Sequence, residues 1–174
     1  MTGGTASVEG DIYLVTKSAD IKRGVANEVA LIPVGASVGQ KWRLLCDQQA
    51  SEDAAWKAST DSVASSLTDI PAKIAYLKGN IRRISESVDR RRLARVAMLK
   101  SAALALSPTG VNAHYRFDRV PPGNYGLFAE MVLDDTPYHW YYRVVLRPGD
   151  AQHVDLDNSR LLDGHFSCDD LPAP

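Results

Sequence analysis

The sequence predicts an α+β protein in which an antiparallel β-sandwich of about seven strands is interrupted by a long antiparallel helical hairpin. Short segments that alternate apolar and polar residues, with turn residues between them, occupy residues 8–33 and 114–162. Residues 36–106 lie between these segments and consist mostly of residue types that are common in helices. Pro71 divides this central part in two, as the start of a second helix would.

Two strands open the predicted sandwich. In VEGDIYLVTK, residues 8–17, the side chains of Val8, Ile12 and Leu14 share one face. Residues 21–33 repeat the alternation, and only the link SAD separates the two segments. We therefore expect them to pair with each other as a β-hairpin.

The central part carries a helix-start signal before each of its halves. Ser37 and Gln40 have the S-x-x-Q spacing of a capping box. Thr68 or Asp69 can cap the second helix, with Pro71 in the first turn, where a missing N–H does no harm. Two helices of about thirty and thirty-five residues should pack antiparallel and reach ~45 Å, and SPTG, residues 107–110, should end the second.

The second helix carries an apolar seam with the 4-3-4-3-4 spacing of a coiled coil. The six members of the seam are Ile70, Ile74, Leu77, Ile81, Ile84 and Val88. After a slip in phase, the stripe continues through Arg92, Val96, Leu99, Ala103 and Leu106. The first helix offers a sparser stripe of Trp42, Leu45, Trp56, Val63 and Leu67. Because this stripe is too thin to cover the seam, apolar surface should remain for the sandwich, a second copy or a foreign subunit.

Strands resume after the helices and flank the turn PPGN, residues 121–124. We expect a tight reversal there in which Gly123 takes a positive φ. The alternation in the flanking segments assigns Phe117, Tyr125 and Trp140 to the core. The tail, residues 163–174, is acidic and contains prolines, which predicts a loose segment.

The net charge of −1 and the charged fraction of 24% are ordinary for a globular protein and argue against a generally basic nucleic-acid binder. No apolar run approaches the ~18 residues that a transmembrane helix needs, and the N-terminal residues lack the pattern of a signal peptide. Cys46 and Cys168 match no metal or redox spacing, which favours two reduced structural thiols. These features lead us to expect a cytoplasmic protein.

The stretch TGVNAHYRFDRVPPGNYGLFAEM, residues 109–131, resembles the signature of carboxypeptidase regulatory-like domains, also called transthyretin-like or prealbumin-like sandwiches. The matching residues are Thr109, Gly110, Tyr115, Phe117, Val120, Pro121, Pro122, Gly123, Tyr125 and Ala129. GDIYLVTKSADIKRGVANEVALIP, residues 10–33, also resembles the opening of a bacterial subgroup that often carries a helical insertion. The resemblance covers residues 8–35 and 107–162 and implies an accessory module that supports or binds another molecule.

The predicted organisation has three parts. Residues 1–35 and 107–162 form the carboxypeptidase regulatory-like sandwich, residues 36–106 form the helical-hairpin insertion, and residues 163–174 form the flexible acidic tail. Because the chain leaves the sandwich near Gly35 and returns near Thr109, we expect these two points to be neighbours in space.

No catalytic or metal site is predicted. The four histidines, His114, His139, His153 and His165, occur singly, so exposed strand or loop positions explain them better than metal ligation does. YHWYY, residues 138–142, lacks the second histidine pair of intradiol dioxygenases, and the chain ends lack the motifs of hydroxyisourate hydrolases. G-x-S-x-G, P-loop and G-x-G-x-x-G motifs are absent from the sequence. We therefore expect a non-enzyme that needs neither a cofactor nor a metal.

Positive charge is concentrated in the second half of the hairpin. Residues 70–106 carry nine basic and two acidic residues, a balance of +7, whereas residues 148–174 have a balance of −5. The predicted partner-binding set is Arg82, Arg83, Arg90, Arg91, Arg92 and Arg95. An acidic protein or an anionic membrane surface fits this set, and nucleic acid fits least, because the basic helix offers only Tyr76 for stacking. A solvated helix face without a partner explains the charges equally well.

Two functional interpretations follow. The leading one is a non-catalytic accessory module that docks onto a larger protein assembly through its hairpin. The alternative is a small-ligand or carbohydrate-binding sandwich that uses His139, Tyr141 and Arg143 on one face of a strand. An exposed apolar patch along the hairpin would favour the first interpretation, and a concave aromatic pocket on the sandwich would favour the second.

Overall fold

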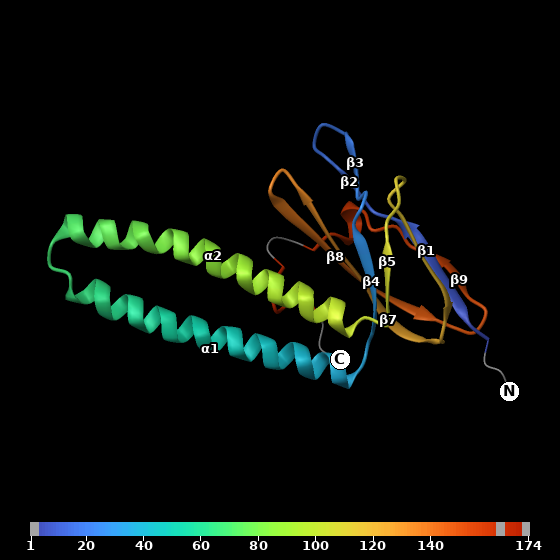
Figure 1. Cartoon of the computed structure of the whole chain (residues 1–174), viewed down its shortest axis with the longest axis horizontal. Helices are drawn as coiled ribbons and strands as arrows, with labels where there is room; N and C mark the ends of the chain where they lie inside the picture. Colours follow the sequence, from blue (N-terminus) through green and yellow to red (C-terminus); the bar gives the residue numbers. More distant parts are fainter. Residues whose placement is uncertain (1–3, 163–165, 172–174) are drawn as a thin grey trace.

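The computed structural model describes residues 4–162 and 166–171, which form two long helices and nine strands. The first strands are β1 (Ala6–Asp11), β2 (Tyr13–Val15), β3 (Ile21–Arg23) and β4 (Glu28–Pro33). The hairpin follows as α1 (Ala36–Ser66) and α2 (Ile70–Ala102). The chain then forms β5 (Ala105–Pro108), β6 (His114–Val120), β7 (Gly123–Leu133), β8 (Thr136–Leu146), β9 (Ala151–His153) and a 3-10 turn, Asn158–Arg160. The predicted fold class is confirmed (Figure 1).

Two sheets face each other across the main core. Their strand orders are β6-β1-β9 and β5-β4-β7-β8, while β2 and β3 form a small separate sheet. The pairs are antiparallel except β1 with β9. The expected opening hairpin is wrong over most of its length, because only residues 13–15 and 21–23 pair with each other. β1 and β4 instead join different sheets and take partners from the second half of the chain.

The main core holds the aromatic residues that the alternation assigned to it. Phe117, Tyr125 and Trp140 are 5%, 6% and 0% exposed. The Trp140 indole N–H donates to the Asp157 carbonyl at 2.8 Å, and the Tyr125 hydroxyl donates to the Pro121 carbonyl at 2.8 Å. Both rings can therefore be buried without leaving a polar atom unpaired.

Gly123 has a different structural role from the expected one. A positive φ, 54°, occurs at Arg119 and not at Gly123, which pairs with Leu146 as the first residue of β7. A Cβ atom on Gly123 would lie 3.3 Å from the Tyr125 ring. The glycine therefore makes room for the buried tyrosine rather than supplying an unusual backbone angle.

The outer face of the β5-β4-β7-β8 sheet carries a second core, on which the base of the hairpin packs. This helix–sheet core consists of Ala30, Ile32 and Phe128 from the sheet, Trp42 from α1, Val96 and Leu99 from α2, and Phe166. β4 is consequently buried on both faces, which explains its unbroken apolar run VALI.

The structure of residues 166–171 contradicts two expectations. Phe166 is fully buried, so this part of the tail is not loose. Cys168 forms a disulfide with Cys46 of α1, so the two cysteines are not free thiols. They are separated by 122 residues, and only the fold brings them within bonding distance. Residues 163–165 and 172–174, the rest of the predicted tail, lie outside the described residues.

Of the two predicted helix caps, the one at the start of α2 is present and the one at the start of α1 is not. Asp69 caps α2, with its carboxylate accepting the Ala72 N–H at 3.0 Å, and Pro71 lies in the first turn as expected. The predicted capping box is wrong, because α1 begins directly after Gly35 and has no side-chain cap. α2 ends at Ala102, earlier than expected, because the following residues pair with β4 as strand β5.

Shortening the hairpin should separate the roles of its two halves. The base belongs to the helix–sheet core, whereas the distal half projects from the sandwich (Figure 1). Replacing residues 57–86 with a short Gly–Ser loop should change the free energy of unfolding by no more than about 1 kcal/mol. Removing residues 36–102 should be strongly destabilising, because each large apolar side chain that it uncovers costs ~1.5–3 kcal/mol. Urea unfolding followed by circular dichroism measures both effects.

The full excision should join Gly35 to Ala103, not to Thr109. The Leu104 N–H bonds the Leu31 carbonyl at 2.8 Å, whereas Thr109 lies at the far end of the β4–β5 pair and bonds Asn27. The expected proximity of Gly35 and Thr109 is therefore wrong. An unfolded short-hairpin variant would show that the distal helices support the sandwich.

Candidate interaction surfaces

One side of α2 is apolar along most of its length, and only the part near the sandwich is covered. Val96 and Leu99 pack into the helix–sheet core. Val88 precedes Leu99 by about three helical turns, which places both on the same side of the helix. The seam that ends at Val88 therefore continues the sheet-facing side of α2 beyond the edge of the sandwich.

The seam is exposed to solvent. The exposed fractions are 72% for Ile70, 48% for Ile74, 45% for Leu77, 65% for Ile81, 44% for Ile84 and 36% for Val88. The expectation that α1 leaves apolar surface uncovered is confirmed. The reason differs from the expected one, because α1 lies against another side of α2.

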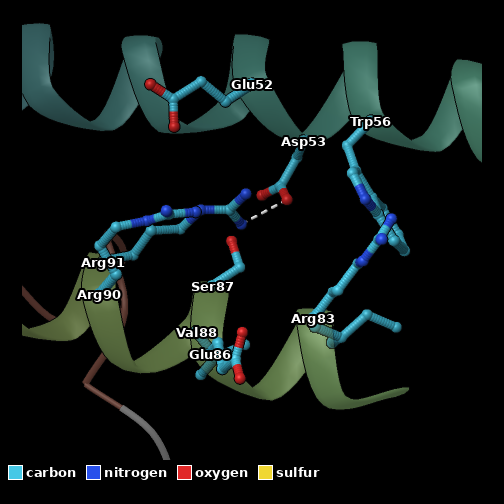
Figure 2. A pocket seen from close by; sticks show the side chains of 10 residues that line it. Glu52, Asp53, Trp56, Arg83, Glu86, Ser87, Val88, Arg90 and Arg91 are labelled. Carbon is cyan, nitrogen blue, oxygen red and sulfur yellow. Dashed lines mark hydrogen bonds and ion pairs between the residues drawn. The ribbon is translucent and has the colours of Figure 1, made fainter. Parts of the chain in front are cut away.

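Polar side chains join the two helices in the half of the hairpin nearer the sandwich. Arg91 of α2 forms an ion pair with Asp53 of α1, and Arg95 donates to the Gln49 side chain at 2.6 Å. Ser87 and Arg91 point from α2 toward α1 in Figure 2. The helices are therefore joined by hydrogen bonds and ion pairs on this side, and a coiled coil between them is not shown.

An open groove of 680 Å³ lies between the helices in the middle of the hairpin (Figure 2). Trp56 of α1 and Ile84 and Val88 of α2 give it apolar walls, and the ion pair of Asp53 and Arg91 bridges it. Trp56 is 38% exposed. Two residues of the seam thus border this groove as well as the outer surface.

The six arginines of the predicted partner-binding set fall into two groups. Arg82, Arg83 and Arg90 are exposed, and Arg82 is paired with Glu86 on the same helix. The second group, which fastens the hairpin, consists of Arg91, Arg92 and Arg95.

Arg95 is the most deeply buried of these arginines. Its guanidinium donates to Gln49 and to the Phe166 carbonyl, and it lies 5.8 Å from the centre of the Phe166 ring. Burial lowers the pKa of Arg95, and the neighbouring charge of Arg91 lowers it further. Arg95 and its partly buried neighbours Arg91 and Arg92 therefore have structural contacts and leave the accessible basic surface to the other three arginines.

A partly buried ionic cluster joins α2 to the sheet. The Glu130 carboxylate of β7 accepts hydrogen bonds from Arg92 and, at 2.7 Å, from Nε2 of His139. Burial raises the pKa of Glu130, but the hydrogen bonds from His139 and Arg92 outweigh it and hold the pKa below its ordinary value. His139 is 1% exposed and stacks on Phe166, with ring centroids 5.0 Å apart. The prediction that His139 is exposed is therefore wrong, and its predicted contact with a ligand stays a prediction, with His139 absent from the lining of the cavity described next.

Tyr141 and Arg143, the other predicted ligand-binding residues, line an open cavity of 380 Å³ at the foot of α1. Gly126 lets Tyr141 lie across the sheet, because a Cβ atom there would come within 2.5 Å of the tyrosine ring. Burial raises the pKa of Tyr141, and the charge of Arg143 opposes this rise. Val38 and Trp42 of α1 also line this cavity.

Across residues 4–162 and 166–171, neither helix combines the length and hydrophobicity that crossing a membrane requires. The same residues contain no cluster of three or more His, Cys, Asp or Glu side chains that could hold a metal ion. His114 and His153 are exposed, as expected, and lie 2.9 Å from Asp11 and 3.0 Å from Asp155. His165 lies outside the described residues.

Comparisons with known proteins leave the family open. No family model and no curated protein matches the chain, so the likeness to carboxypeptidase regulatory-like domains remains a resemblance. A solved structure from Pseudomonas aeruginosa, of a protein proposed to bind carbohydrate, is similar over 91% of both chains, with 16% identity and a TM-score of 0.44. A minor pilin of Streptococcus agalactiae is similar over 88% of this chain and 44% of its own, with 10% identity and a TM-score of 0.38.

A major pilin of Bacillus cereus is similar over 87% of this chain and 30% of its own, with 9% identity and a TM-score of 0.34. The chain therefore spans less than half the length of these two pilins. Similarity at TM-scores below 0.5 does not support assigning a function to this chain.

Replacing Glu130 with Gln should destabilise the protein by about 3 kcal/mol at neutral pH, because Arg92, which is 14% exposed, loses its counter-charge. The pKa of Glu130 is lowered by folding, so its contribution is present above the unfolded pKa of ~4.3 and is lost as the pH falls through the folded value. The difference in stability between parent and variant should therefore narrow below about pH 4. Urea unfolding of both proteins at a series of pH values measures this difference in stability.

Glu86→Gln is the matched control. Glu86 pairs with Arg82 on the exposed surface, so its replacement should cost at most ~0.5 kcal/mol. A stability difference for Glu130→Gln that stayed constant through the acid range would contradict the role assigned to its charge.

Proposed function

We propose that the protein is a non-catalytic interaction module whose hairpin binds an acidic amphipathic helix of another protein along the apolar seam. The observation that supports this most is the exposure of all six seam residues, from 36% to 72%. The seam continues the side of α2 that the sheet covers near Leu99. A bound helix would therefore cover this side where the sandwich no longer reaches.

The spacing of the seam favours a helix as its occupant. Apolar residues at 4-3 intervals provide the holes into which the side chains of a second helix fit. At 1.5 Å per residue, the segment from Ile70 to Val88 spans ~27 Å, which a partner helix of about eighteen residues would cover. The seam is narrow and contains no aromatic residue, whereas helices that lie on membranes combine a large apolar face with Trp, Phe or Leu.

The charges beside the seam favour an acidic partner. With the seam at heptad positions a and d, Lys73 falls at position g and Lys78 at position e, where charges pair across a helix interface. Exposed Arg82, Arg83 and Arg90 add positive charge farther along α2. A second copy of α2 would place lysine beside lysine, whereas glutamates on a partner would neutralise them. Such complementary charges raise the association rate more than the final affinity.

A designed amphipathic peptide of about three heptads tests this proposal directly. With Leu and Ile at a and d and Glu at e and g, it should bind about tenfold more tightly than the same peptide with Lys at e and g. Lys73→Glu combined with Lys78→Glu should reverse this preference. Lys17→Glu combined with Lys22→Glu, near the β2–β3 turn, changes the net charge equally and should leave the preference unchanged. Fluorescence anisotropy of labelled peptides at low and moderate salt measures the affinities.

Three outcomes would contradict the proposal. Ile74→Ser combined with Ile81→Ser should abolish binding without lowering the melting temperature, so binding that survives this change would exclude the seam. Anionic vesicles that bind the protein when the peptide does not would indicate a membrane surface. Self-association in sedimentation velocity without peptide binding would assign the seam to a second copy.

A second candidate function is the binding of a neutral saccharide in the Tyr141 cavity. The observation that favours it is the tyrosine ring lying across Gly126, which gives the cavity an aromatic floor. The cavity is also lined by two arginines and two aspartates, which provide hydrogen-bond donors and acceptors without net charge: Arg43, Arg143, Asp47 and Asp169. An apolar cavity with a few polar groups around it is the usual form of a ligand site.

A glycan array probed with labelled protein, followed by calorimetry on the ligand found, tests the second candidate. Tyr141→Ala should weaken binding about tenfold or more, because the aromatic floor is lost. Tyr142→Ala is the control, since the Tyr142 ring lies 4.5 Å from the Arg160 guanidinium and does not line the cavity. An array without signal would reject the candidate.

A further inference from the structure

Residues 166–171, here called the strap, place one aromatic ring at the centre of the helix–sheet core. The ring of Phe166 lies 5.5 Å from that of Trp42 and 5.3 Å from that of Phe128, measured between centroids. It also stacks on His139 at 5.0 Å, and the Arg95 guanidinium donates to its carbonyl. Phe166 therefore contacts α1, α2 and strands β7 and β8 together.

Besides the contacts of Phe166, two further bonds hold the strap. Cys168 is joined to Cys46 of α1 by the disulfide, and its carbonyl accepts the Trp42 indole N–H at 3.1 Å. Both bonds lead to α1, which carries no other covalent tie to the described part of the strap. The disulfide thus fixes the distance between α1 and the segment that inserts Phe166.

The two cysteines of the disulfide border two open cavities. Cys46 and Cys168 both line the 380 Å³ cavity that contains Tyr141. They also line a second open cavity, of 270 Å³, together with Val88, Arg91 and Arg95. The two arginines favour the approach of a thiolate and stabilise a cysteine thiolate as it leaves. Val88 is the last residue of the seam, so this second cavity lies where the seam ends.

We propose that the Cys46–Cys168 bond is a thiol-reducible clamp whose cleavage lets the strap withdraw Phe166 and opens the helix–sheet core beside the seam. A thiolate of a dithiol reductant attacks one sulfur, a mixed disulfide forms, and the other cysteine leaves as a thiolate. The second thiol of the reductant then displaces the remaining cysteine. The reductant ends as a cyclic disulfide, and the protein, having gained two electrons and two protons, carries two thiols.

Without the covalent bond, non-covalent contacts retain the strap. They include the packing of Phe166 and Leu171 on the helix–sheet core and the hydrogen bonds from Arg95 to Phe166 and from Trp42 to Cys168. A short segment held in this way can open locally at a lower free-energy cost than unfolding of the whole protein. The clamp would be closed in an oxidising compartment and open in the cytoplasmic location expected from the sequence.

Hydrogen–deuterium exchange on the intact chain, before and after dithiothreitol treatment, tests the clamp without any partner or ligand. Amides of residues 166–171 should exchange at least about tenfold faster after reduction, and those of residues 92–99 should follow. β6, which lies in the other sheet, should keep its protection. Cys46→Ser combined with Cys168→Ser should behave like the reduced protein with or without dithiothreitol.

Two results would overturn the clamp. Unchanged exchange in the strap, with reduction verified by thiol alkylation and mass, would mean that the non-covalent contacts keep it closed. Loss of protection in β6 as well would show that the disulfide stabilises the whole fold.

A second variant, Phe166→Ala with the disulfide intact, isolates the contribution of the ring. It should speed exchange in residues 92–99 without reductant, because α2 loses the contacts of the ring with Arg95 and the helix–sheet core. Exchange there at the parent rate would also overturn the proposal. Failure of the peptide to bind the seam would not affect any of these readouts.

Discussion

The packing of the hairpin base on the outer face of the β5-β4-β7-β8 sheet is the constraint on which the rest of the structure depends. β4 is apolar on both faces, so one facing sheet cannot bury it, and the second face requires a further layer. Trp42, Val96 and Leu99 supply that layer. Burying Leu99 against the sheet fixes the rotation of α2 about its axis and directs the rest of the same helix side, the seam, into solvent.

The ion pairs between the hairpin and the sandwich follow from the same packing. Because α2 crosses the sheet near Glu130, Arg92 can pair with this carboxylate, and Arg91 and Arg95 reach α1 and the strap. Buried pairs of this kind contribute little net stability but are costly to break. They therefore favour one angle between hairpin and sandwich over others. The positive charge of α2 is divided into an anchored part near the base and an accessible part beside the seam.

The two candidate surfaces are close to each other although they differ in chemistry. The disulfide borders the Tyr141 cavity on one side and a cavity that contains Val88 on the other. A ligand in the first cavity and a helix on the seam would thus both lie near the disulfide. The strap contacts the sheet and both helices, and its Cys168 lines both cavities, so the two surfaces could influence each other through it.

Local signals in the sequence determined the elements: Asp69 and Pro71 start α2, period-two alternation assigns Phe117, Tyr125 and Trp140 to the core, and the 4-3 spacing defines the seam. These features depend on neighbours a few residues away, so a single segment contains all the information. Only the tertiary structure decided that β1 and β4 join different sheets and that Cys46 is bonded to Cys168. It also decided that residues 105 and 106 belong to strand β5 and not to the helix. It also decided that Arg95 and His139 are buried, because the burial of a side chain on a helix or strand depends on which distant element covers that side.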